Sequence, residues 1–236
     1  MLNVFDFLFP RFCAVCGTAL HPSEQHVCIH CFMDLPRTLS HTPENSRLEE
    51  SYWGKIPIVH ATALMKYNES FKRVIYSLKY DGNTPLGEYF GRLLAQEIKD
   101  NSTFFSDIDC IIPIPLHWRR QLRRGYNQCY YIARGISQVT HLPILTGTVR
   151  RIINNKSQTR LTPEERQRNV QDIFRCTRPD LLRGKHILIV DDVITTGATT
   201  TSCALSILRA LGDYSDDSLN IRSSVRFSIL ALAIAE

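Results

Sequence analysis

The sequence lacks a hydrophobic run long enough to cross a lipid bilayer. Its longest largely apolar stretch, residues 227–235, is far shorter than the ~20 residues that a membrane-spanning helix requires. The first ten residues also lack a basic leader and a small-residue cleavage site, and they carry Asp6 among their apolar positions. We therefore expect a cytoplasmic protein without a membrane span.

Two nucleotide-binding signatures are absent as well. Neither the GxxxxGK(S/T) pattern of Walker loops nor the GxGxxG pattern of dinucleotide-binding folds occurs in the chain. The sequence has no internal repeat or low-complexity segment, and its 236 residues are 44% hydrophobic and 22% charged. This composition excludes a disordered tail protein and allows one full domain with a small accessory module.

Acidic residues are scarce in one part of the chain. Residues 117–168 hold eleven Lys or Arg and two acids, a net charge of +9 in a chain whose total is +5, so the remainder carries −4. Such a basic segment indicates a surface that meets a polyanion, either a phosphorylated small molecule or a nucleic acid. A solvated basic face is the alternative interpretation.

Cysteine, in contrast, is concentrated near the N-terminus. Four of the eight cysteines form two CxxC pairs separated by eleven residues: Cys13, Cys16, Cys28 and Cys31. Two such pairs supply four thiolates to the corners of a tetrahedron, which is the geometry of a closed structural Zn²⁺ site. His21, His26 and His30 lie in the same window, so three cysteines with one histidine are an alternative, and two disulfides are another. We favour a four-cysteine zinc site that holds the fold together without performing chemistry.

The composition divides the chain into three parts. We expect a zinc-ribbon-like four-cysteine module over residues 1–38, a linker over 39–55 and the main domain over 56–236. The stretch 36–51 is rich in Pro, Ser, Glu and Asn, which is typical of a loop.

The main domain alternates between extended and helical patterns. Apolar residues recur with the spacing of one helix face, as at Phe71, Val74, Ile75 and Leu78, and short apolar runs are typical of parallel strands covered on both faces. These patterns predict strands at 60–67, 109–115, 186–190 and 226–235, the last closing the sheet, and helices at 69–79, 86–99, 127–139 and 199–211. Such alternation favours a mainly parallel sheet that binds ligands beyond the carboxyl ends of its strands.

One strand-to-helix turn carries the strongest chemical signal. An apolar run ends in Asp191 and Asp192, and the loop 195–199, Thr-Thr-Gly-Ala-Thr, leads into a helix. Backbone N–H groups at a helix N-terminus and threonine hydroxyls form a cradle for a monophosphate, and Gly197 permits close approach. The carboxylates precede the loop at the distance of a sugar attached to that phosphate, and they accept hydrogen bonds from ribose hydroxyls. An ordinary turn with a threonine cap explains Thr199 but not two adjacent carboxylates.

This segment resembles the motif with which type I phosphoribosyltransferases bind 5-phosphoribosyl 1-diphosphate (PRPP). The resemblance implies that Asp191 and Asp192 hold the ribose. It also implies that the 5′-phosphate is held by the loop residues Thr195, Thr196, Gly197, Ala198 and Thr199.

A second block extends the resemblance to a family. Residues 111–128, IIPIPLHWRRQLRRGYNQ, and residues 156–169, KSQTRLTPEERQRN, are similar to the ComF/GntX family of competence-associated phosphoribosyltransferase-like proteins. That family also carries an N-terminal four-cysteine zinc module, so the resemblance spans nearly the whole chain. It implies an α/β type I phosphoribosyltransferase fold, with a parallel sheet of about five strands and a small hood, that binds PRPP with Mg²⁺.

Basic residues beside these motifs are the candidate catalytic groups. The loop after residue 115 would face the diphosphate with Arg119, Arg120 and Arg124, because guanidinium groups bind phosphate oxygens in pairs and stay charged. Residues 154–169 are typical of a lid, whose Lys156 and Arg160 would close over the site and exclude water. Plain surface charge is the alternative for the arginines of this segment.

Three further features are less specific. The sequence KYDG at 79–82 matches a family element to which we assign no role beyond proximity to the ligand. Trp118 and Tyr126 lie among arginines, where aromatic rings either stack on bases or pack in the core. No residue stands out as a general base, and His117, the nearest titratable candidate, has packing as its alternative role.

Two functions from different classes agree with these features. The first is a phosphoribosyltransferase, in which an unidentified acceptor attacks the anomeric carbon of PRPP and diphosphate leaves with Mg²⁺, in DNA uptake or nucleotide salvage. The alternative is a non-catalytic accessory protein of natural transformation, which senses PRPP or binds single-stranded DNA or proteins of the competence machinery.

Overall fold

The centre of the molecule is a parallel four-stranded sheet with the order β1-β6-β5-β2. The structure is a computed structural model and describes residues 11–38, 43–153, 173–214 and 224–235. The strands are β1 (Ile58–Lys66), β2 (Cys110–Pro113), β5 (His186–Ile194) and β6 (Arg226–Ile234). A parallel bridge between Ile111 and Ile144 adds a short fifth segment beside β2. This sheet confirms the predicted parallel α/β architecture.

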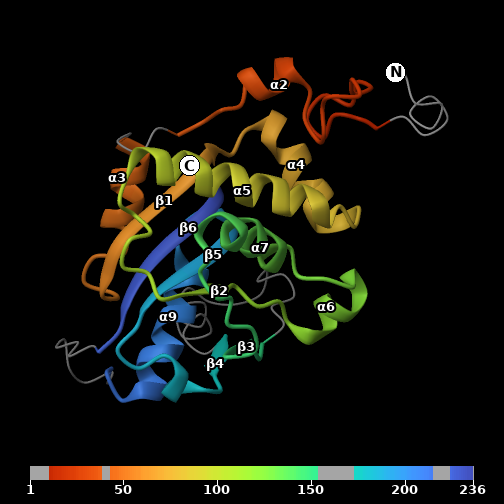
Figure 1. The fold of residues 1–236 in the computed structure, drawn as a ribbon. Helices are drawn as coiled ribbons and strands as arrows, with labels where there is room; N and C mark the ends of the chain where they lie inside the picture. The colour runs from red at the N-terminus through yellow and green to blue at the C-terminus, as the bar shows by residue number, and fades with distance from the viewer. Residues whose placement is uncertain (1–10, 39–42, 154–172, 215–223, 236) are drawn as a thin grey trace.

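Helices cover both faces of the sheet (Figure 1). One face carries α4 (Glu69–Tyr80), α5 (Thr84–Asn101) and α7 (Gln128–Thr140), and the other carries α9 (Ala198–Leu211). Strand side chains alternate between the two cores, so that Leu188 and Val190 pack beneath α4, α5 and α7 whereas Ile187 and Ile189 pack beneath α9. Because both faces are buried, the strands are nearly continuous apolar runs.

The predicted helices and strands are all present, with two corrections. We expected the C-terminal strand to close the sheet, but β6 lies inside it, between β1 and β5. Every residue of β6 after Arg226 is buried, and an interior position covers both faces of such a strand. We also expected the central strand to end at residue 190, but β5 continues through Asp191 to Ile194 because these residues pair with β6.

Several short elements were not evident from the sequence patterns. The helix α6 (Trp118–Arg124) follows β2, the strands β3 (Val149–Arg151) and β4 (Phe174–Cys176) pair antiparallel, and a 3₁₀ turn spans Pro179–Leu181. The helix α3 (Pro43–Glu50) lies within the stretch 36–51, so our interpretation of that stretch as a loop is wrong. Leu48 and the following Tyr52 and Ile56 are buried in the core beneath α9, which orders this segment.

Two glycines allow α5 and α7 to approach each other closely. A Cβ added to Gly91 would lie 2.2 Å from the carbonyl oxygen of Ile132, and one added to Gly135 would lie 2.2 Å from that of Glu88. Neither position can hold a side chain without moving a helix. This contact fixes α7, whose first residues reach the functional site.

The N-terminal cysteine module packs against α4 and α5. The Arg73 side chain donates to the carbonyl oxygen of Val15 at 3.3 Å, and the His26 ring lies 5.3 Å from the ring of Tyr89. The module contains the short helix α2 (Ile29–Met33). Among the helices of the described ranges, none is both long and apolar enough to cross a membrane.

Candidate functional site

Two adjacent buried carboxylates, Asp191 and Asp192, lie near the carboxyl end of β5. A carboxylate oxygen of each lies within 4.8 Å of one of the other and of the Cys129 sulfur, so the two acids form one cluster at the start of α7. The Asp192 carboxylate is fully engaged: Oδ1 accepts from the backbone N–H of Val193 at 2.8 Å, and Oδ2 accepts from the amide of Gln128 at 2.9 Å. The ammonium of Lys79 also lies 2.9 Å from Oδ2.

Lys79 belongs to the KYDG sequence at the end of α4, and the structure gives that sequence a place in the site. Burial by itself would lower the pKa of Lys79, but the charge and the hydrogen bond of Asp192 outweigh burial and raise it. The lysine therefore stays charged and neutralises Asp192. Tyr126 holds the end of α4 in place, since its hydroxyl donates to the carbonyl oxygen of Leu78 at 2.8 Å.

Asp191 has a different environment. Its Oδ1 accepts from the backbone N–H of Asp192 at 2.9 Å and lies 3.5 Å from the thiol of Cys129. Burial, together with the charge of Asp192, raises the pKa of Asp191 to about 7. Burial and the same carboxylates raise the pKa of Cys129 well above its ordinary value, so this cysteine stays a thiol. Among the described residues, Lys79 contacts Asp192 and no lysine contacts Asp191.

The turn after β5 brings the N-terminus of α9 next to the carboxylates. Gly197 is the N-cap of this helix and has a φ of +71°, a conformation that favours glycine. No side chain caps the helix, so the threonine cap of the ordinary-turn interpretation is absent from this described turn. The first N–H groups of α9 lack intrahelical partners, as at any helix start, and are available to an anion.

A tyrosine from outside the motif supports this turn. The hydroxyl of Thr200 donates to the carbonyl oxygen of Gly197 at 2.8 Å, and the hydroxyl of the fully buried Tyr52 lies 2.7 Å from the Thr200 oxygen. Because the Thr200 proton is donated to Gly197, the Tyr52 hydroxyl donates to the Thr200 oxygen, and burial raises the pKa of Tyr52 to about 12. A Cβ on Gly197 would lie 2.7 Å from the Tyr52 hydroxyl, so the glycine is required sterically as well.

The arginines predicted to face a diphosphate lie on α6. Arg124 donates to the amide oxygen of Gln128 and packs over the ring of Tyr80, 5.5 Å from its centre. Arg119 packs over the ring of Trp118 at 5.1 Å. Arg120 lies on the same helix, and its charge adds to burial in lowering the pKa of Arg151.

His117 caps α6 and is buried. Its Nδ1 accepts from the backbone N–H of Arg119 at 3.2 Å, which gives the histidine a structural role. Burial, together with the charge of Arg119, lowers its pKa. The predicted lid, including Lys156 and Arg160, lies outside the described residues.

The N-terminal module brings Cys13, Cys16, Cys28 and Cys31 together, with all four sulfur atoms within 4.8 Å of one another. In a tetrahedral site with Zn–S bonds of about 2.3 Å, neighbouring sulfurs are about 3.8 Å apart. The Cys16 and Cys28 sulfurs lie 3.8 Å apart, which fits that geometry. None of the eight cysteines, all within the described residues, forms a disulfide. The cluster can hold a metal ion with four thiolates.

Sequence reasoning missed several residues of the site. Tyr52 lies in the expected linker, and only the fold brings it under the turn after β5. Gln128 is the last residue of the block 111–128, and Cys129 follows it. Nothing in their spacing predicts that they contact the carboxylates. The family match at KYDG was the signal for Lys79, although it did not indicate a partner.

The chain is similar in sequence to proteins of DNA utilization and competence. No family model matches the sequence. DNA utilization protein YhgH of Shigella flexneri is 31% identical over 199 residues, which cover 84% of each chain. Competence protein F of Haemophilus influenzae is 27% identical over 228 residues, which cover 90% of this chain and 95% of that protein. Among solved structures, a glutamine PRPP amidotransferase from B. subtilis is 15% identical with a TM-score of 0.37, and the match covers 65% of this chain but only 30% of that one.

The fold and the site define a class: a parallel α/β protein with a buried carboxylate pair and a glycine-capped helix start at the carboxyl edge of its sheet, joined to a four-cysteine module. The similarity to proteins of DNA utilization and competence identifies the family. The chain belongs to the ComF/GntX family of competence protein F-like proteins.

Proposed function

We propose that this protein binds PRPP at the carboxyl edge of its sheet and transfers or recognises the phosphoribosyl group, in DNA uptake or nucleotide salvage. The observation that carries the proposal is the juxtaposition of Asp191 with the uncapped N-terminus of α9 across the turn at Gly197. A sugar phosphate needs an acceptor for its hydroxyls and donors for its phosphate, and this edge offers both. The names of the relatives support a role in DNA utilization or competence.

The contacts divide the work between the two acids. Asp191 accepts hydrogen bonds from the ribose hydroxyls. Asp192 is held by Lys79 and Gln128 and fixes the end of β5 next to Asp191. The N–H groups at the start of α9 hold the 5′-phosphate with the hydroxyls of Thr195, Thr196 and Thr199. Lys79 removes one of the two negative charges, which lowers the repulsion that a polyanionic ligand meets.

In the transfer reaction an acceptor forms a bond to the anomeric carbon, and the bond to diphosphate breaks with its electron pair going to the leaving group. The arginines of α6, Arg119, Arg120 and Arg124, stabilise that charge, and Lys156 and Arg160 complete the enclosure. Mg²⁺ would enter with the diphosphate and neutralise its oxygens. Mg²⁺ prefers oxygen ligands, and the Asp191 carboxylate would supply one.

The alternative function is a single-stranded DNA-binding accessory role without catalysis. The specific observation in its favour is the exposed surface of α6, where Trp118 is 61% and Leu122 is 80% exposed among four arginines. Aromatic rings and arginines together bind single strands by stacking and charge.

The test is a calorimetric titration of PRPP into the full chain, with and without Mg²⁺. We expect Mg²⁺-dependent binding in the micromolar range, and loss of it in Asp191→Asn, because the variant removes an acceptor without adding volume. Asp180→Asn, at an exposed position distant in sequence from the turn, is the matched control and should bind as the wild type does. Far-UV circular dichroism of each variant verifies that the fold is retained.

Failure of the wild type to bind PRPP would refute the proposal. In that case the same chain is titrated with single-stranded DNA at rising salt, since binding through phosphates weakens steeply with salt concentration. Unchanged PRPP affinity in Asp191→Asn would show that PRPP binds elsewhere.

A further inference from the structure

The helix start at Gly197 rests on a side chain from a distant part of the chain. Tyr52 follows α3, in the stretch that the sequence patterns predict to be a linker, and its side chain is fully buried. Its hydroxyl lies 2.7 Å from the Thr200 oxygen. Burial, together with the charge of Asp191, raises the pKa of Tyr52 to about 12, so the phenol keeps its proton at neutral pH and can donate it.

The segment that carries Tyr52 is held in place on both sides. Leu48 and Ile56 are buried in the core on the α9 face of the sheet. An oxygen of Glu49 accepts from the backbone N–H of Ala61 on β1 at 3.3 Å. Because this segment is fixed to both the core and the sheet, the Tyr52 hydroxyl has a defined position beneath the turn.

Hydrogen bonds connect Tyr52 to the first peptide of α9. The Tyr52 hydroxyl donates to the Thr200 oxygen, and the Thr200 hydroxyl donates to the carbonyl oxygen of Gly197 at 2.8 Å. The same carbonyl oxygen accepts from the backbone N–H of Thr201 at 2.9 Å. In a trans peptide the C=O and the N–H point in opposite directions. Holding the Gly197 oxygen inside the helix therefore aims the N–H of Ala198 out of the helix start.

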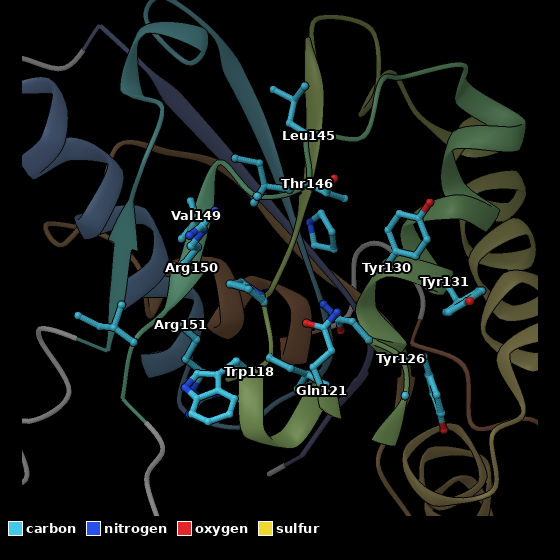
Figure 2. Close-up of a pocket in the computed structure, with 18 residues that line it drawn as sticks. Trp118, Gln121, Tyr126, Tyr130, Tyr131, Leu145, Thr146, Val149, Arg150 and Arg151 are labelled. Carbon is cyan, nitrogen blue, oxygen red and sulfur yellow. The ribbon is translucent and has the colours of Figure 1, made fainter. Parts of the chain in front are cut away.

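Tyr52 acts on a ligand only through this turn. The phenol lies directly beneath it, since a Cβ added to Gly197 would be 2.7 Å from the Tyr52 hydroxyl. A cavity of about 850 Å³ opens beside β2, between α6, α7 and β3 (Figure 2). Neither Tyr52 nor Thr200 lines that cavity, so neither side chain is placed to touch a molecule held there.

We propose that Tyr52 is a positioning residue for the anion site at the start of α9: through Thr200, its hydroxyl fixes the peptide between Gly197 and Ala198 so that its N–H meets the 5′-phosphate of a phosphoribosyl ligand. The proposal rests on the function proposed above and adds the segment after α3 to that site. A donor that is already aimed before the ligand arrives needs no reorganisation on binding.

The test is calorimetric titration of ribose 5-phosphate, which carries the 5′-phosphate without the diphosphate, into the full chain. We expect Tyr52→Phe, which removes only the hydroxyl, to weaken binding about three- to tenfold. Thr200→Val should lose at least as much affinity, whereas Thr200→Ser, which keeps the hydroxyl, should bind as the wild type does. Because Tyr52 acts through Thr200, adding Tyr52→Phe to Thr200→Val should cause no further loss.

Ser228→Ala is the matched control for stability. Ser228 is also fully buried, and its hydroxyl lies 2.9 Å from Nε2 of His186, near the amino ends of β5 and β6. The control removes a buried hydroxyl from the opposite edge of the same sheet. It should lower the midpoint of thermal unfolding about as much as Tyr52→Phe does, and it should bind ribose 5-phosphate with the affinity of the wild type.

Nuclear magnetic resonance reports the aim of the peptide directly. In the wild type, saturating ribose 5-phosphate should move the amide proton of Ala198 downfield, because its N–H gains a charge-assisted hydrogen bond. In Tyr52→Phe this shift should be smaller at saturation. The amide of Thr201 should also exchange its hydrogen faster in that variant without ligand, because the Gly197 carbonyl is held less firmly.

The results separate this proposal from the one on which it rests. A wild type that binds neither ribose 5-phosphate nor PRPP would refute the phosphoribosyl site, and the role of Tyr52 with it. Three results would overturn the role of Tyr52 alone while the site stands. They are wild-type affinity in Tyr52→Phe, additive losses in the double variant, and an equal loss of affinity in Ser228→Ala.

Discussion

Lys79 decides the charge balance at the carboxylate pair. Its side chain is 27% exposed and that of Asp192 is 7% exposed, so the contact is largely withdrawn from water. Removing one partner of such a pair leaves the other charge buried without compensation. Asp192 would retain the amide of Gln128 and the N–H of Val193, which are neutral donors.

We predict that Lys79→Met destabilises the protein by about 3 kcal/mol, because a buried carboxylate loses its counter-charge. Urea unfolding at neutral pH measures the free energy of unfolding. The double variant Lys79→Met with Asp192→Asn should recover most of the loss, since it removes both charges. Lys72→Met, on the same helix in an exposed pair with Glu69, is the control and should cost less than about 1 kcal/mol. Equal losses at positions 79 and 72 would contradict the charge-balance role.

At the scale of elements, the contact between α5 and α7 positions the start of α7 at the site. Gly91 and Gly135 let the two backbones meet, and the first turn of α7 carries Gln128 and Cys129 to the carboxylates. A shift of α7 would therefore reach the functional edge. The helix α9 packs in the core on the other face of the sheet and begins at the turn of Gly197.

We predict that Gly91→Ala destabilises the protein by about 1–3 kcal/mol, because the new Cβ would overlap the carbonyl oxygen of Ile132. Thermal unfolding measures the effect. Gly87→Ala, one turn earlier in α5, meets its nearest neighbour at 3.1 Å, on the side chain of Tyr131, so it should cost much less. If the two substitutions have equal effects, the close helix contact does not limit stability.

At the scale of the whole molecule, the cysteine module shares a core with the main domain. Cys13, Val15 and Cys28 are buried in the same cluster as Phe71 and Phe90 of α4 and α5. Loss of the metal should therefore affect more than the module, because its apolar residues cover part of that core.

We predict that the purified wild type holds about one Zn²⁺ per chain and that Cys13→Ser loses it. Metal analysis by mass spectrometry measures the content, and thermal unfolding should show a lower midpoint for the variant. Cys176→Ser, a half-buried cysteine outside the cluster, should retain the metal. A wild-type protein purified without any metal would overturn the zinc assignment.

Local patterns account for most of the elements. The helices α4, α5, α7 and α9 follow from apolar spacing, and β2 and β5 follow from short apolar runs. The end of β5 was predicted too early, because Asp191 and Asp192 look like the start of a loop until their pairing with β6 is known. α3 and α6 are short and polar, so their spacing carries no comparable signal.

The four-cysteine cluster and the turn after the two aspartates were evident in the sequence, because each is a contiguous motif of a few residues. The roles of the predicted site residues in binding PRPP stay predictions. Only the tertiary structure joined Lys79 to Asp192 and Tyr52 to Thr200, and only it formed the cavity between α6, α7 and β3. These contacts connect residues far apart along the chain, and their geometry depends on how helices pack on the sheet, which no local pattern encodes.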